Sequence, residues 1–146
     1  MRDRDSIPGP DALRALLESS PFHGFLKLEV DRLDKEAGEL VLRLPYKDTY
    51  QRQPRSGYVH GGVLAALVDV AGAFAMISFV GRNVPTTSLH VDYLRPVIAS
   101  DLRATATVRR AGKTVGLVDV EVHDADGKLA ALGRVSLSTG GGGTDE

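Results

Sequence analysis

A long apolar run over residues 63–80 constrains this chain more than any other feature, because only Asp69, Gly72 and Ser78 interrupt it. Its length touches the lower threshold for a membrane span, roughly 18 residues. A span is rejected, since an aspartate near its middle would cost about 3 kcal/mol on insertion into a bilayer. A helix that is apolar on all sides is otherwise a helix buried in a protein core. The run therefore predicts one long central helix.

Strand-like segments flank this helix on both sides. Before it, apolar and polar residues alternate over 26–30 and 40–44, as in half-buried strands, with a polar turn over 34–39 where Gly38 can adopt a positive φ. After it come four further strand-like runs, at 86–95, 102–109, 118–123 and 129–137. Short turns let these strands pair antiparallel, except across the helix. The order predicts an α+β fold in which an antiparallel sheet curls around one long helix.

One domain accounts for a chain of 146 residues. We expect an N-terminal extension over 1–20, in which 10–19 form a short amphipathic helix that Pro21 and Gly24 close. The domain itself spans 21–139. Residues 140–146 are predicted to form a flexible, glycine-rich tail.

Charge and cysteine content exclude several classes of function. The 18 basic and 19 acidic residues give a net charge of -1, whereas nucleic-acid-binding domains usually carry a basic excess. The chain has no cysteine, which removes disulfides and thiol nucleophiles. The 4 histidines stand singly, without the spacing of metal ligands. The first residues lack the apolar stretch of a secretory signal, so we expect a cytoplasmic protein without a membrane partner.

Two glycines, Gly61 and Gly62, follow His60 at the start of the central helix. The first turn of a helix has free N–H groups and a partial positive charge, and glycine lets another group approach closely. Such a place can bind an anion or stabilise an oxyanion. The same dipeptide also makes an ordinary turn before a helix, and the residues leave both interpretations open.

Asp69 lies within the apolar helix, where an unpaired charge is costly to bury. It is either a structural aspartate with a buried partner, or a general base or nucleophile. Gly61 lies roughly 12 Å away along a helix that rises about 1.5 Å per residue, so one substrate carbonyl cannot touch both. A shared reaction needs two antiparallel helices, which predicts a two-fold dimer with two sites at its interface.

The His-Gly-Gly start of a long apolar helix, with Asp69 further along it, resembles the hotdog-fold thioesterases of the phenylacetate-degradation type. The segment 86–96, ending in Tyr-Leu-Arg-Pro, is similar to that family's strand after the helix, and 109–113 is similar to its Gly-Lys turn. The resemblance covers residues 22–138. It implies a hotdog fold, a dimer that pairs further into a tetramer, and hydrolysis of acyl-CoA. No cofactor is implied, because coenzyme A is part of the substrate.

The resemblance also implies catalytic roles. The Gly61 N–H would polarise the thioester carbonyl, and Asp69 of the other subunit would be the nucleophile or general base. His60 would shape the start of the helix, or merely cap the loop. A hydroxyl after the helix, from Thr86 or Thr87, would assist.

Two further features of the family pattern concern the substrate. Many members have an Asn or Gln where this chain has Pro54, so either Gln53 substitutes through a shifted loop, or it is solvated and Gly61 acts alone. Residues implied to bind the acyl-CoA are Gly62, Arg95, Arg110, Gly112 and Lys113. The alternative for the charged ones is that they are solvated strand ends. The acyl group stays open between a small aryl and a medium-chain acyl.

Other functions compete with this interpretation. A hotdog hydratase or dehydratase resembles a different motif, with a catalytic histidine and an acid placed otherwise. A non-catalytic acyl-CoA sensor usually adds a DNA-binding helical domain, for which the residues before the first strand are too few. A serine hydrolase is unlike this chain, because the nucleophile motif G-x-S-x-G is missing. Asp69 favours catalysis over sensing.

Overall fold

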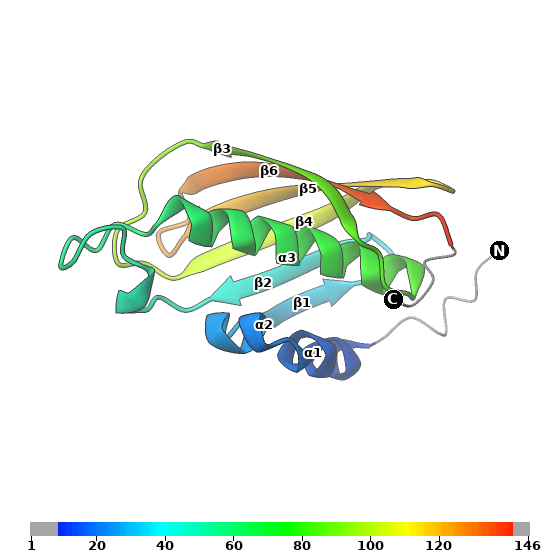
Figure 1. The fold of residues 1–146 in the computed structure, drawn as a ribbon, viewed down its shortest axis with the longest axis horizontal. Coiled ribbons are helices and arrows are strands. Elements are labelled where there is room, and N and C mark those ends of the chain that lie inside the picture. Colours follow the sequence, from blue (N-terminus) through cyan, green and yellow to red (C-terminus); the bar gives the residue numbers. More distant parts are fainter. Residues whose placement is uncertain (1–8, 142–146) are drawn as a thin grey trace.

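The computed structural model describes residues 9–141 and has the hotdog arrangement, a 6-stranded antiparallel sheet curled around one long helix (Figure 1). The elements are α1 (Pro10–Ser19), α2 (Pro21–Leu26), β1 (Glu29–Asp34), β2 (Glu39–Leu44), a 3-10 turn (Asp48–Tyr50), α3 (Gly61–Val80), β3 (Thr86–Tyr93), β4 (Leu102–Ala111), β5 (Val115–Asp124) and β6 (Leu129–Ser138). The strand order is β1-β2-β4-β5-β6-β3. The predicted fold class is confirmed.

The apolar helix α3 fills the interior of the curled sheet, so the predicted central helix is confirmed. Its length and hydropathy would also suit a membrane span, but here the sheet covers most of it. Two glycines permit the close approach of α3 to β6. A Cβ on Gly72 would lie 2.6 Å from Val135, and a Cβ on Gly133 would lie 2.3 Å from Val68. Both distances are too short for carbon atoms, so side chains at these positions would push the helix off the sheet.

The strand over 26–30 is the one predicted element that is wrong. Residues up to Leu26 belong to α2, and β1 begins only at Glu29. Pro21, expected to help end the first helix, instead starts the second, because proline at the first helical position gives up no helical hydrogen bond. Lys27 ends α2 in a left-handed conformation with φ 53°. The turn before β2 follows the prediction, with Gly38 at φ 64°.

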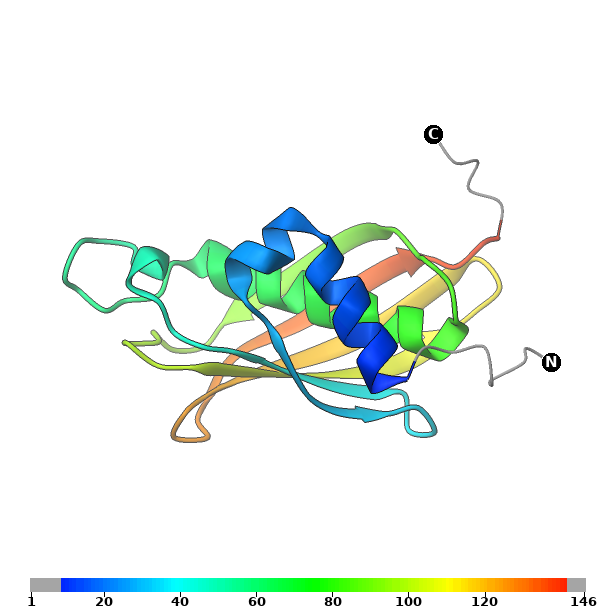
Figure 2. The same cartoon turned by 90° about the horizontal axis from the view of Figure 1, so that it is seen from below.

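The N-terminal helices pack onto the same core as the sheet (Figure 2). Leu13 and Leu17 of α1 are buried, and the His23 ring of α2 meets Phe74 of α3 edge-on, with ring centroids 5.4 Å apart. The predicted extension begins outside the described residues, at 1–8, and residues 142–146 of the predicted tail also lie outside them.

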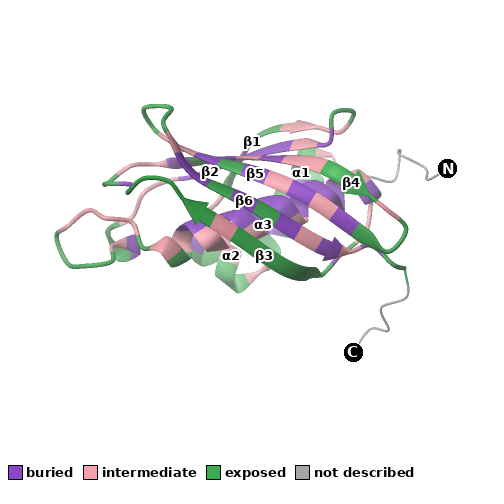
Figure 3. Ribbon diagram, turned by 90° about the horizontal axis from the view of Figure 1, so that it is seen from above, coloured by how far each residue is buried: buried purple, intermediate pink, exposed green. Residues whose placement is uncertain are grey.

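The strand β3 forms one edge of the sheet and is exposed along nearly its whole length (Figure 3). It pairs with β6 on one side, and within the described residues no strand pairs with its other side. A long edge with free N–H and C=O groups is a template for pairing with another chain.

Candidate active site

At the start of α3, the backbone N–H groups differ in whether they have a hydrogen-bond acceptor. His60 is the N-cap, and its ring nitrogen Nδ1 accepts a hydrogen bond from the Gly62 N–H at 2.9 Å. The Val63 N–H donates to the His60 carbonyl oxygen at 2.9 Å. Among the described residues, no group accepts a hydrogen bond from the Gly61 N–H. Gly61 therefore offers the free donor of this first turn, while the N–H of Gly62 is engaged.

Tyr93, at the end of β3, packs directly on Gly61. The tyrosine hydroxyl donates to the Gly61 carbonyl oxygen at 2.7 Å. A Cβ on Gly61 would lie 3.3 Å from the Tyr93 ring, so any larger residue would press on the tyrosine. Tyr93 belongs to the segment 86–96 that is similar to a strand of the thioesterase family, but the sequence predicted no role for it. Its contact depends on how β3 crosses the helix, which no local pattern reveals.

Asp69 lies half-buried on α3, facing the start of β3. The Thr86 hydroxyl donates to its Oδ1 at 2.8 Å. The Thr87 hydroxyl instead donates to the Ser136 carbonyl oxygen at 3.1 Å. Of the two threonines named from sequence, only Thr86 therefore touches the carboxylate. Within the described chain Asp69 has no second hydrogen-bond partner, which leaves its Oδ2 available.

A cleft of about 440 Å³ opens beside the start of α3, and we call it the α3 cleft. It is lined by Arg52, Tyr58, Val59, Gly61, Gly62, Leu64, Tyr93, Leu94, Arg95, Pro96 and Val97. This set contains two guanidinium groups and no carboxylate. Neither Arg52 nor Arg95 makes an ion pair within residues 9–141, and Arg52 lies over the Tyr58 ring at 5.3 Å. Sequence reasoning missed Arg52, because it stands in a loop without any periodic pattern.

The predicted residues Arg110, Gly112 and Lys113 lie far from this cleft in the same chain. They belong to the β4–β5 hairpin, whose Gly116 packs on Met76 near the other end of α3. Met76 follows Gly61 by 15 positions, or roughly 22 Å at about 1.5 Å per residue. Within one chain, the hairpin and Gly61 therefore lie near opposite ends of α3.

Gln53 lies in the exposed loop before α3, and it does not line the α3 cleft. Its carbonyl oxygen accepts hydrogen bonds from Ser56, while its side-chain amide has no partner among the described residues. The neighbouring Gln51 has a structural task instead, since its side chain accepts the Gly57 N–H at 2.7 Å.

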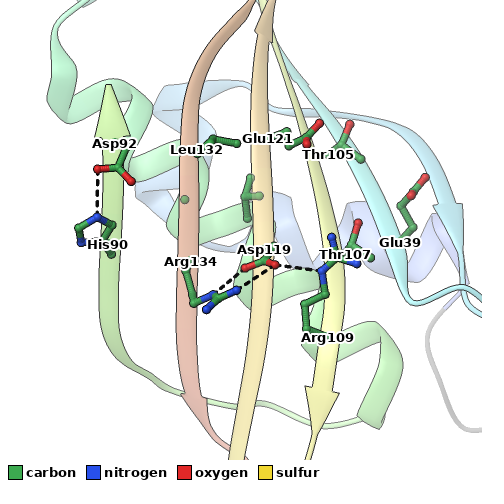
Figure 4. A pocket seen from close by; sticks show the side chains of 12 residues that line it. Glu39, His90, Asp92, Thr105, Thr107, Arg109, Asp119, Glu121, Leu132 and Arg134 are labelled. Atoms are coloured by element: carbon green, nitrogen blue, oxygen red, sulfur yellow. Dashed lines mark hydrogen bonds and ion pairs between the residues drawn. The ribbon is translucent and has the colours of Figure 1, made fainter. Parts of the chain in front are cut away.

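A larger groove, of about 720 Å³, lies on the outer face of the sheet, and we call it the outer groove (Figure 4). Its charges are largely paired with one another. Asp119 accepts hydrogen bonds from Arg134 at 2.7 Å and Arg109 at 3.0 Å, and His90 contacts Asp92 at 3.1 Å. The hydrogen bonds from Arg134 lower the pKa of Asp119 below its ordinary value. In the part of the chain that the structure describes, no three acidic or histidine side chains gather as metal ligands.

Comparison with known proteins agrees with this fold. The sequence model of the thioesterase superfamily matches residues 56–131. The chain is 41% identical over 127 residues to a candidate esterase of Halobacterium salinarum, covering 79% of this chain and 83% of that protein. It is 36% identical over 110 residues to the acyl-coenzyme A thioesterase PaaI of Escherichia coli, covering 73% and 75%. The solved structure of the E. coli PaaI protein from the phenylacetic acid degradation operon matches with a TM-score of 0.77 at 30% identity, covering 88% and 91%.

The match to the family model spans more than half of the chain, and the relatives align over most of their own lengths. The chain therefore belongs to the thioesterase superfamily, and with it to the thioester-hydrolysing enzymes of the hotdog fold.

Proposed function

We propose that the chain hydrolyses acyl-CoA thioesters at a site formed by two subunits, with Gly61 from one and Asp69 from the other. One observation carries the proposal. At the start of β3, Thr86 is hydrogen-bonded to Asp69, and at the end of the same strand Tyr93 is hydrogen-bonded to Gly61. The strand thus connects the two groups that the reaction needs, although they lie too far apart on α3 to meet in one chain.

The exposed edge of β3 supplies the geometry for the dimer. If two copies of this edge pair antiparallel about a two-fold axis near Leu89 and His90, Tyr93 of one chain lies opposite Thr86 of the other. Gly61 then faces the partner subunit's Asp69. Two such sites form per dimer, in agreement with the argument from the helix length. Pairing of two dimers into a tetramer stays a prediction.

The chemistry follows from these two groups. The free Gly61 N–H donates to the thioester oxygen as negative charge develops there. As a general base, Asp69 takes a proton from water while the water oxygen attacks the carbonyl carbon. The C–S bond then breaks, and coenzyme A leaves as a thiolate that takes up a proton. As a nucleophile, Asp69 would instead form a mixed anhydride that water opens.

Single-turnover hydrolysis in ¹⁸O-water gives a decisive result for the nucleophile route only. Label that enters Asp69 itself requires the anhydride, because only its opening at the aspartyl carbonyl places water oxygen in the protein. Label found in the acid product alone fits general-base catalysis, and also an anhydride opened at the acyl carbonyl. We favour the general base, since Thr86 already holds one oxygen of Asp69 and leaves the other for water.

The coenzyme portion of the substrate is polyanionic, and the cations around the proposed site suit it. Arg95 and Arg52 line the α3 cleft without a carboxylate partner. In the proposed dimer, the hairpin that carries Arg110, Gly112 and Lys113 of the partner subunit approaches the same end of α3, because the two helices run antiparallel. Gly62 borders the cleft and would contact the substrate through its backbone.

Gln53 is a candidate for a second donor to the oxyanion, because its amide is free to reorient in the exposed loop. Gln53→Ala tests this through kcat, and Gln51→Ala controls for damage to the loop. A fall of about 10²-fold would identify a second donor. An unchanged kcat would leave the Gly61 N–H as the one assigned donor.

The acyl group is proposed to be a small aryl or a medium-chain acyl. Turnover of a panel that contains both kinds of acyl-CoA, and the corresponding free acids as binding controls, tests the function as a whole. Hydrolysis by the wild type that Asp69→Asn abolishes would support the thioesterase. Binding of acyl-CoA without any turnover by the wild type would point to a sensor and contradict the proposal.

A further inference from the structure

The peptide group between Gly61 and Gly62 is fixed from both ends. Its N–H donates to the His60 ring at 2.9 Å, and its carbonyl oxygen accepts from the Tyr93 hydroxyl at 2.7 Å. The Tyr93 ring also fills the space where Gly61 would carry a side chain, at 3.3 Å. Glycine is the residue with the most backbone freedom, and these contacts fix the carbonyl side of Gly61. The bond from the Val63 N–H to the His60 carbonyl oxygen fixes the preceding peptide, which carries the Gly61 N–H.

Such restraint matters because an oxyanion donor acts best when it is held in place before the reaction. A preorganised N–H costs no reorientation as charge develops in the transition state. The His60 side chain occupies the neighbouring Gly62 N–H, so only the Gly61 N–H remains to be aimed. Nothing else among the described side chains donates to the Gly61 carbonyl oxygen, which makes the tyrosine hydroxyl the restraint from the β3 side.

Tyr93 contributes little to the packing of the core. It is 53% exposed and lies on the edge strand, where its ring contacts Gly61 rather than the interior of the sheet. Tyr50 serves as a comparison outside the α3 cleft, since its hydroxyl also donates to a backbone carbonyl oxygen, that of Leu26 at 2.9 Å. Tyr93 and Tyr50 therefore make the same kind of hydrogen bond, but only that of Tyr93 reaches Gly61.

We infer that Tyr93 is a positioning residue for this reaction, holding Gly61 so that its free N–H points at the thioester oxygen. The inference rests on the proposed function, in which that N–H is the oxyanion donor. Tyr93 itself touches no reacting atom in this scheme. Its effect therefore passes wholly through Gly61, and this gives it a signature that a structural role lacks.

The test compares Tyr93→Phe with Tyr50→Phe, since each keeps the ring and removes one hydroxyl that donates to a backbone carbonyl oxygen. For Tyr93→Phe we expect kcat for acyl-CoA to fall roughly fivefold to tenfold, as for loss of one hydrogen bond. We expect KM to change less than about twofold, since the contacts that bind the substrate before the reaction do not include the Tyr93 hydroxyl. The melting temperature and the sedimentation coefficient should match those of the wild type. Tyr50→Phe should leave kcat unchanged, although loss of its buried hydrogen bond should lower the melting temperature.

A second background shows whether the effect passes through Gly61. Gly61→Pro removes the N–H itself, and His60 at φ -61° and ψ 135° already has the conformation that precedes proline. With no N–H left to aim, adding Tyr93→Phe to Gly61→Pro should lower kcat no further. An equal fall in both backgrounds would overturn the inference, as would an unchanged kcat for Tyr93→Phe or a rise in KM alone.

The wild type in the same assay keeps the two proposals apart. If it hydrolyses acyl-CoA while Tyr93→Phe matches it in kcat, only the role of Tyr93 is overturned. If the wild type hydrolyses none of the acyl-CoAs, the thioesterase proposal fails, and the role of Tyr93 fails with it.

Discussion

The two grooves of this molecule differ in whether their polar groups already have partners. The outer groove is the larger, but its central carboxylate, Asp119, is bound by two arginines from neighbouring strands (Figure 4). The α3 cleft is smaller, yet within residues 9–141 its Gly61 N–H has no acceptor and its two guanidinium groups form no ion pair. A site that binds an anion must keep donors unoccupied, so the availability of donors favours the α3 cleft as the proposed site although the outer groove is larger.

The same contrast holds for the two aspartates. Asp69 on α3 and Asp119 on β5 are each partly buried, and each accepts hydrogen bonds. Asp119 spends both oxygens on Arg109 and Arg134, whereas Asp69 gives one oxygen to Thr86. A carboxylate with a free oxygen can take a proton from water. The contrast supports the catalytic task proposed for Asp69 and favours a cross-strand structural task for Asp119.

The largest expected effect on kcat comes from changing Asp69 to asparagine, and the same change at Asp119 is its control. Asp69→Asn should lower kcat by at least about 10²-fold with acyl-CoA affinity largely kept, because the amide fills the same space but cannot accept the proton. Asp119→Asn, the matched control, should leave kcat unchanged. Turnover, acyl-CoA affinity and melting temperature are measured on one preparation of each. A folded, binding and fully active Asp69→Asn enzyme would contradict the assignment.

A second test removes the free donor of the α3 cleft. Gly61→Pro deletes the N–H at a helix position that tolerates proline, and kcat should fall about 10²-fold. Gly61→Ala is the control, since it adds the same Cβ against Tyr93 but keeps the N–H. Its kcat should fall much less than that of Gly61→Pro. Equal losses in the two variants would show that crowding of Tyr93, rather than loss of the donor, is what matters.

The arginines of the two grooves should differ in their effect on substrate binding. Replacing Arg52 and Arg95 together with alanine should raise KM for acyl-CoA about fivefold, with a smaller change in kcat, as for exposed charges. The control replaces Arg109 and Arg134 of the outer groove and should leave KM unchanged. Arg110→Ala with Lys113→Ala should also raise KM if the partner's hairpin holds the phosphates. Higher salt should reduce the rise in KM for the Arg52 and Arg95 variant and for the Arg110 and Lys113 variant.

The smallest effect concerns stability at low pH. Because its arginine partners lower the pKa of Asp119, the ionised carboxylate stabilises the fold above its ordinary pKa of 3.8. That contribution, less than about 1 kcal/mol for a partly exposed pair, is lost as pH falls below this value. The free energy of unfolding of the wild type should therefore fall more steeply below pH 4 than that of Asp119→Asn. Parallel curves would remove the structural task given to Asp119.

The sequence predicts more of the fold than of the candidate site. Alternation and the apolar run are local signals, and they sufficed for α3 and for five of the six strands. The helix α2 escaped because it is short, and because Pro21 looks the same when it ends one helix as when it starts another. The choice of Thr86 over Thr87, and the contact of Tyr93 with Gly61, depend on how β3 crosses α3. Contacts of that kind are fixed by tertiary packing and leave no periodic trace.

In the proposed mechanism, each site takes Gly61 from one subunit and Asp69 from the other. Mixing the inactive variants Gly61→Pro and Asp69→Asn, after exchange of subunits, tests it most directly. In a mixed dimer one of the two sites combines an intact Gly61 with an intact Asp69, while the other carries both changes. Random exchange should thus restore about a quarter of the wild-type kcat per site. If both groups acted within one chain, every site would stay defective, and activity no higher than that of the separate variants would contradict the account.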